Sequence, residues 1–336
     1  MLSYNEFKEF CLKEFNTYFP NGQVKNVTYR KTNAEIDGVE VLENPDSKIS
    51  GRFDLKELYQ EYIDETKKGH DYAEYDVVQS AAQGYYQTDG TRDFIENAFS
   101  GYIDKTMLFN NLSFKLVNTE MNREYLKNIP HREYLDMSVT YISMIGDGMN
   151  AIINNGIMDR FGITEQELFE NAYNNEKSNT QIYEMKDLMQ SLLLGGECQN
   201  LLEDDSFIDE GQEMKLYVMT NSEKLFGAGT VLISEHLQFL AEKLNDDLFV
   251  IPSSLHECLI LPKSIMEAKN VADMIYEVNM FEVDIKDRLS NNVYSFTRGD
   301  DGLRMAEYVS DKKIDGTDLQ QDQNRKNPPV QGGGSR

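Results

Sequence analysis

The chain has 336 residues, of which 40% are hydrophobic, and 58 acidic against 33 basic residues give a formal net charge of −25. The hydrophobic fraction is sufficient for a packed core, and the length allows one large domain or two. The negative charge argues against direct binding to the nucleic-acid backbone or to anionic membranes. It leaves open an acidic mimic of nucleic acid, which would need its carboxylates on one ordered face.

Three isolated cysteines, Cys11, Cys198 and Cys258, lack the paired spacing of a disulfide framework, which favours a reducing compartment. No Cys-x-x-Cys pair is present, so a structural zinc site is not expected. The N-terminus has no apolar targeting region, and no run approaches the ~20 apolar residues of a membrane span. The sequence therefore predicts a cytoplasmic protein with no membrane contact, no cofactor and no metal site.

Residues 1–70 predict a small α-β-β-α unit. Ser3 and Glu6 have the spacing of a capping box, which opens a helix. Further elements follow in order: strands at Val24–Lys31 and Ile36–Leu42, a hairpin turn between them at Thr32–Glu35 or at Asp37-Gly38, and a helix at Leu55–Glu65.

Residues 71–200 predict a mainly helical middle with a β-run near 136–145. Phe114–Val117 predicts a short strand, and Pro130–Glu133 predicts a turn before the β-run. Two helices follow, one from a capping box at Thr164 and Glu167 to about Asn174, and one over Gln181–Leu194.

Residues 214–300 predict a mixed β-sheet with helices covering it. The predicted strands are Leu216–Thr220, Gly229–Ile233, Leu248–Ile251, Cys258–Leu261 and Val293–Thr297, and the covering helices are 234–245 and 265–280. Residues 311–336 lose their apolar content and are predicted to be a disordered tail. The fold class is α+β.

The turn between Leu248–Ile251 and Cys258–Leu261 contains the densest chemistry of the chain. Pro252 and Pro262 mark strand ends, since proline cannot donate to a sheet ladder. The candidate site residues are Ser253, Ser254, His256 and Glu257 in this turn, together with His131 and Asp136.

Two interpretations of this turn stay open. In the structural one, the serines cap free backbone groups and His256 bonds a carbonyl. In the catalytic one, a serine is the nucleophile, His256 its base and a carboxylate the orienting group, and His131 would have to meet His256 in space. Neither G-x-S-x-G nor H-E-x-x-H is present, so no hydrolase or zinc-protease motif supports catalysis.

Several segments together resemble the DUF5688 proteins of Firmicutes over roughly residues 3–300. The matching segments are Asp54–Tyr62; Lys115-Leu116-Val117-Asn118 with Asn122; Pro130-His131-Arg132 with Leu135-Asp136; Glu167-Leu168 with Ala172 and Asn175; Tyr217–Asn221 with Gly227-Ala228; and Ile251–Glu257. The resemblance implies a bacterial accessory protein with a link to mobile genetic elements, and it implies no activity.

We therefore expect a non-enzymatic accessory or interaction protein whose partner is a protein. One alternative is an enzyme that uses the Ser253/Ser254/His256/Glu257 turn with His131. Another is an acidic nucleic-acid mimic that binds a basic protein.

Overall fold

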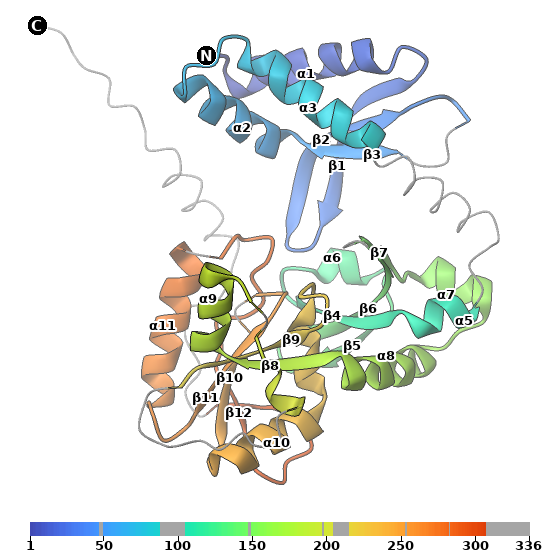
Figure 1. The fold of residues 1–336 in the computed structure, drawn as a ribbon. Coiled ribbons are helices and arrows are strands. Elements are labelled where there is room, and N and C mark those ends of the chain that lie inside the picture. Colours follow the sequence, from blue (N-terminus) through green and yellow to red (C-terminus); the bar gives the residue numbers. More distant parts are fainter. Residues whose placement is uncertain are drawn as a thin grey trace, which may run out of the picture. The chain divides into compact units, whose positions relative to one another are not determined.

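The computed structural model describes residues 1–46, 50–87, 105–146, 149–196, 198–203, 215–252, 254–281 and 283–306. The chain forms two compact units, Met1–Asp104 and Lys105–Arg336 (Figure 1). Helices and antiparallel sheets both contribute to them, which confirms the α+β class. The tail predicted at 311–336 lies outside the described residues.

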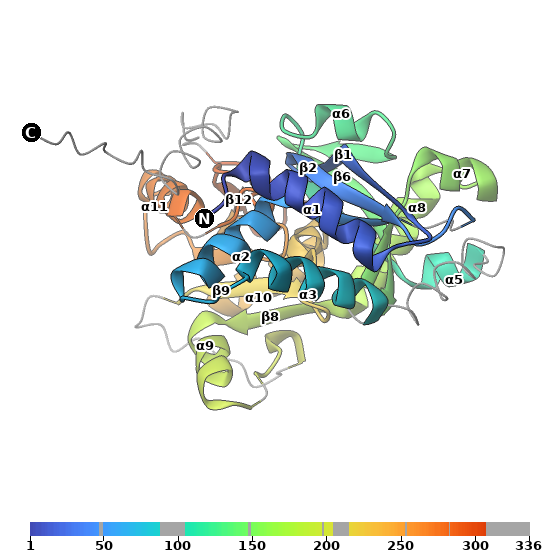
Figure 2. The same cartoon turned by 90° about the horizontal axis from the view of Figure 1, so that it is seen from above.

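The first unit is a three-stranded antiparallel sheet, in the order β1-β2-β3, with helices on one face (Figures 1 and 2). Its elements are α1 (Tyr4–Tyr18), β1 (Gln23–Lys31), β2 (Ala34–Leu42), β3 (Gly51–Asp54), α2 (Leu55–Lys67) and α3 (Ala73–Gln87). Phe7, Phe15 and Tyr62 lie in the core between the helices and the sheet, and Phe7 stacks on Tyr62 with ring centroids 4.9 Å apart.

The capping box at Ser3 and Glu6 is present, and the hairpin turn lies at Thr32-Asn33, within the first of the two predicted positions. Asn33 has φ 62°, a left-handed conformation that asparagine tolerates in tight turns. Strand β3 was not predicted. The unit also extends past residue 70, because α3 supplies buried Val77 and Val78 to the same core.

The second unit begins with a four-stranded antiparallel sheet in the order β4-β6-β5, with β7 paired to β6. Its elements are α5 (Lys105–Asn110), β4 (Leu112–Asn118), α6 (Arg123–Leu126), β5 (His131–Tyr134), β6 (Met137–Gly146), β7 (Met149–Ile152), α7 (Asn155–Phe161) and α8 (Glu165–Asn179). The β-run near 136–145 is confirmed as β6. The predicted turn at Pro130–Glu133 is wrong, since β5 occupies it and gains its ladder from β6.

A six-stranded sheet forms the rest of the second unit, in the order β13-β12-β10-β11-β9-β8. Its elements are β8 (Thr180–Glu184), α9 (Met185–Leu194), the 3₁₀ helices η2 (Leu201–Glu203) and η3 (Gly227–Leu232), β9 (Tyr217–Asn221), α10 (Ser234–Leu244), β10 (Leu248–Ile251), β11 (Cys258–Pro262), α11 (Ala268–Phe281), β12 (Tyr294–Phe296) and β13 (Arg304–Met305). The two strands that flank the polar turn, β10 and β11, form the central pair of this sheet.

Three predictions for this region are wrong. The sheet is not mixed, because every strand pair in its described part is antiparallel. Gly229–Ile233 is not a strand; η3 packs there so tightly that a Cβ on Gly229 would lie 2.6 Å from Phe114 Cβ. The predicted helix Gln181–Leu194 begins as strand β8, because pairing with β9 overrides the local helical pattern.

Helix α11 covers one face of this sheet through Val271, Ala272 and Ile275, which pack against Phe249 and Ile251. Helix α8 instead covers the four-stranded sheet, where Phe169 lies 5.3 Å from Phe114 between ring centroids. The capping box at Thr164 and Glu167 that opens α8 is confirmed. Within the described residues, every helix is too short or too polar to cross a lipid bilayer.

Glu176 of α8 is buried against β4 with a relative exposure of 2%. One carboxyl oxygen, Oε1, accepts from the Ser113 hydroxyl, and the other, Oε2, has no hydrogen-bond partner among the described residues. Burial raises the pKa of Glu176 to about 7, and the Ser113 hydroxyl and the nearby Asn221 amide offset this only in part. Between about pH 4.5 and pH 7, the Glu176 carboxyl of the folded protein therefore holds a proton that the unfolded chain has released.

We expect the second unit to lose roughly 3 kcal/mol of stability as the pH rises from about 4.5 to about 7, because the native state binds more protons in that range. Glu176→Gln, which resembles the protonated carboxyl, should remove this loss. Urea unfolding followed by circular dichroism at several pH values measures it. Glu170→Gln on the same helix is the control, and an unchanged pH slope in Glu176→Gln would contradict the assignment.

Candidate functional site

The turn between β10 and β11 is held by its own polar groups. Ser254 Oγ accepts from the His256 backbone N–H at 3.0 Å and donates to Glu257 Oε1 at 2.6 Å. Ser254 also forms an isolated β-bridge with Arg288 and is only 6% exposed. Its hydroxyl is thus committed to the turn, while Ser253 lies outside the described residues.

Both ring nitrogens of His256 face partners. Nδ1 accepts from the Phe226 backbone N–H at 3.3 Å, and Nε2 lies 3.5 Å from Asp287 Oδ1. An accepting Nδ1 places the proton on Nε2 in the neutral ring. The lone pair that a general base needs is therefore occupied by a backbone amide, which argues against the serine–histidine pair of the catalytic interpretation.

A buried lysine that sequence reasoning missed lies beside this turn. Lys115 of β4 is 6% exposed, and its Nζ is 4.1 Å from the centroid of the Phe226 ring. Phe226 in turn stacks on His256, with ring centroids 5.4 Å apart and planes at 19°. We call Lys115, Phe226, His256 and Asp287 the Lys115 cluster.

Burial changes the protonation equilibrium of the Lys115 amine. Burial lowers its pKa to about 8, and the negative charge of Asp287 counteracts this only in part. Within the described part of the chain, no hydrogen bond or ion pair reaches Nζ; its charge rests on the Phe226 ring face. The sequence signal was a lysine inside the otherwise uncharged strand Leu112–Asn118.

Gly227 makes this arrangement possible. A Cβ at Gly227 would lie 2.2 Å from Thr220 Oγ1 and 2.7 Å from the His256 carbonyl oxygen. Those are forbidden contacts, so only glycine allows the chain to approach so closely. Thr220 Oγ1 donates to the same His256 carbonyl at 2.8 Å, which fixes the turn against β9.

His131, the other histidine candidate, is exposed at the start of β5, where its Nδ1 lies 2.8 Å from the Ile129 carbonyl. The register pairs His131 with Thr140 and Thr140 with Lys115. Two strand spacings separate His131 from Lys115, about 10 Å between backbones. Among the described residues, no hydrogen bond joins His131 to the turn.

Asp136 connects the two sheets of the second unit. Its Oδ2 accepts from Ser290 Oγ at 3.0 Å and from Asn292 Nδ2 at 2.9 Å, and its Oδ1 accepts from the buried Tyr294 hydroxyl. Burial raises the pKa of Tyr294 well above its usual value, so this hydroxyl stays a donor. These bonds account for the Asp136 carboxylate as a structural acceptor.

The described residues contain no group of three or more His, Cys, Asp or Glu side chains placed to hold a metal ion. The site is therefore a turn on a central strand pair of an α+β protein, with a buried amine beside it. Residues 4–298 match the model of a family of unknown function, DUF5688, and the chain belongs to that family. No curated protein and no solved structure matches it.

Replacing the buried amine should stabilise the fold. Lys115→Met removes a charge from an apolar site, and we expect the second unit to gain about 2 kcal/mol at pH 7. The folded-state pKa of Lys115 is lowered, so the folded wild type binds fewer protons than its unfolded chain between about pH 8 and 10.5. The stability of the wild type therefore rises in this pH range, and the advantage of Lys115→Met becomes smaller.

Urea unfolding at pH 7 and pH 10 measures this gain. Lys127→Met is the matched control. Lys127 is an exposed lysine at the C-terminal end of α6 that pairs with Glu124, and its replacement should change the stability by less than about 1 kcal/mol. A Lys115→Met protein that is less stable than the wild type at pH 7 would show that the amine has a strong partner.

Proposed function

We propose that this protein acts as an accessory protein by binding another protein, and that helix α9 supplies the contact surface. The observation that carries the proposal is the exposure of four apolar side chains on α9: Met189 54%, Leu192 74%, Leu193 79% and Leu194 76%. Met189, Leu192 and Leu193 have i, i+3, i+4 spacing and so share one face of the helix. We call these three residues and the adjacent exposed Leu194 the α9 face; contiguous exposed apolar residues are typical of interaction sites.

The sheet edge next to α9 does not favour strand addition. Strand β8 is the last strand of the six-stranded sheet, and its Ile182 N–H donates to Asn200 Oδ1 at 3.0 Å. A side chain thus takes a donor that an added strand would need. This supports docking through the helix side chains, in which an apolar helix face enters a groove of the partner.

The negative charge of the chain favours a basic protein as the partner. The segment 197–213 that follows α9 carries seven acidic and no basic residues, and the whole chain carries a net charge of −25. Two copies of a chain with this net charge repel each other, whereas an apolar groove with a basic rim is complementary. A role in mobile genetic elements belongs to the same proposal and comes from the family resemblance.

A photo-crosslinking residue at position 192 tests the α9 face, with the exposed Gln60 of α2 as the control position. We expect one discrete basic protein to be crosslinked from position 192 and not from position 60. The purified partner should then bind Leu192→Glu/Leu193→Glu at least tenfold more weakly than the wild type, while Gln190→Glu binds normally. Equal binding to all variants, or crosslinks only to a second copy, would contradict the proposal.

The acidic mimic has less support. It requires a continuous stripe of carboxylates, but Glu40, Glu165 and Glu235 each pair with cations from other elements: Lys25 and Arg52, Arg132, and Lys177. Cations interspersed in this way break up a stripe that would imitate a phosphate backbone.

The Lys115 cluster favours a second candidate function, an enzyme with a nucleophilic amine. A pKa of about 8 leaves a useful fraction of Lys115 neutral near neutral pH. Such an amine attacks the carbonyl carbon of an aldehyde or ketone, passes its protons to the oxygen and releases water to form an imine. In this form the enzyme alternative uses Lys115 beside the turn, in place of His131.

Reductive trapping tests this chemistry. With glyoxylate and cyanoborohydride, we expect the peptide that contains Lys115 to gain mass faster at pH 8 than at pH 6, because the neutral amine reacts. The peptide that contains Lys127 in the same digest is the internal control. Labelling of Lys115 that is no faster than that of Lys127 would rule out the enzyme candidate.

A further inference from the structure

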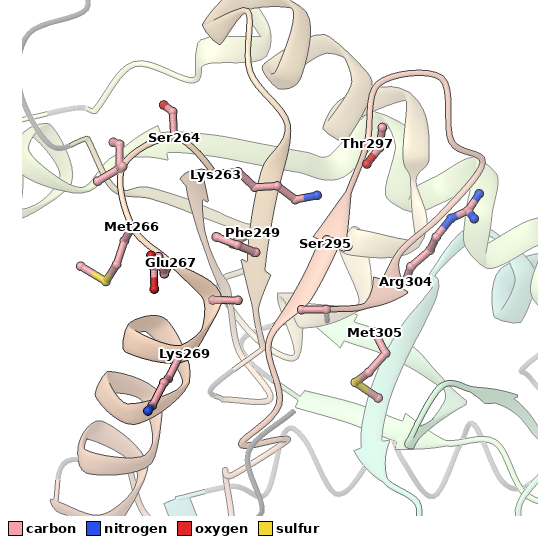
Figure 3. A pocket seen from close by; sticks show the side chains of 13 residues that line it. Phe249, Lys263, Ser264, Met266, Glu267, Lys269, Ser295, Thr297, Arg304 and Met305 are labelled. Carbon is pink, nitrogen blue, oxygen red and sulfur yellow. The ribbon is translucent and has the colours of Figure 1, made fainter. Parts of the chain in front are cut away.

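Helix α11 covers one face of the six-stranded sheet. Part of that face stays uncovered next to the N-terminal end of the helix. A cavity of about 830 Å³ lies there (Figure 3). Phe249 of β10, Ser295 of β12 and Arg304 of β13 are paired in register and form its floor. Met305 also lines it, and the loop 263–267 with the start of α11 forms one wall. This volume lies in the range of small-molecule sites, about 300–1,000 Å³.

The charges that line the cavity are opposite in sign to those of the chain. Three cations, Lys263, Lys269 and Arg304, line it against one carboxylate, Glu267, although the chain has 58 acidic and 33 basic residues. A cationic lining in so acidic a protein favours an anionic ligand. The acidic surface around the cavity repels anions, so the cavity is the place where an anion is attracted.

Two of these cations, Lys263 and Arg304, keep N–H donors that have no hydrogen-bond partner among the described residues. Lys263 Nζ is 3.9 Å from Asp247 Oδ2, too far for a hydrogen bond, and lies 5.7 Å from the centroid of the Phe249 ring. In Figure 3 its side chain extends across the opening above Phe249, with Arg304 on the far side. Arg304 is held by Asp300 at 2.7 Å through one nitrogen, which leaves further N–H groups for a ligand.

The floor and walls add an apolar part to this site. Phe249 is only 7% exposed, and the methionine side chains of Met266 and Met305 line the same cavity. Methionine and phenylalanine give an adaptable apolar contact for an alkyl or aromatic group. We propose that this cavity binds a small amphipathic anion, with its carboxylate, sulfonate or phosphate between Lys263 and Arg304 and its apolar part on Phe249.

Titration with 1-anilinonaphthalene-8-sulfonate, an aromatic anion whose fluorescence rises in apolar sites, tests the proposal on the full chain. We expect saturable binding that decanoate displaces and that decanol does not. Lys263→Gln/Arg304→Gln should weaken binding at least tenfold. The double variant Lys127→Gln/Lys177→Gln changes the net charge equally outside the cavity and should bind like the wild type.

Two further variants separate the alternatives. Leu192→Glu/Leu193→Glu removes the apolar character of the α9 face. We expect this variant to bind the dye with wild-type affinity, which would show that the dye does not bind at the α9 face. Phe249→Leu keeps both cations. We expect it to lower the affinity for the dye, while inorganic phosphate should compete with the dye as well as it does in the wild type. Wild-type affinity in Lys263→Gln/Arg304→Gln with its circular dichroism spectrum intact, or loss of dye binding in the α9 variant, would overturn the proposal.

Discussion

The close approach of the chain at Gly227 to the His256 main chain is the constraint on which the centre of the second unit depends. There is no room for a Cβ between Gly227 and the Thr220 hydroxyl or the His256 carbonyl. This contact packs the start of η3, after β9, against the turn between β10 and β11, although α10 and β10 separate the two segments in the sequence. Phe226, next to Gly227, stacks on the His256 ring and also carries the Lys115 amine over its ring.

Two buried titratable groups, Lys115 of β4 and Glu176 of α8, lie near each other along strand β4. Ser113 and Lys115 lie two residues apart on β4, so their side chains leave the same face of the sheet. Ser113 meets the buried carboxyl of Glu176, and Lys115 meets Phe226. Burial is the first cause of both pKa shifts, and each shift favours the neutral form. At neutral pH both groups therefore lower the stability of the fold, because burial penalises the charged form of each.

Much of the fold could be predicted because its signals are local. The capping boxes at Ser3 and Thr164 start helices through contacts that span only three residues. The prolines at 252 and 262 correctly bounded the two strands that proved central to the sheet. The predictions failed where a partner strand decides the outcome: Gln181 begins a helical pattern but pairs with β9, and His131 follows a proline but pairs with β6.

The sequence by itself determined the α+β class, the family and the polar turn at Ser254, His256 and Glu257, because helix caps, strand-ending prolines and motif order are written in neighbouring residues. Only the tertiary structure decided what surrounds that turn. Lys115 precedes His256 by well over a hundred residues, and no local pattern places its amine on Phe226 or predicts that burial lowers its pKa. Desolvation depends on everything packed around a group, so such a site exists only once the sheets have come together.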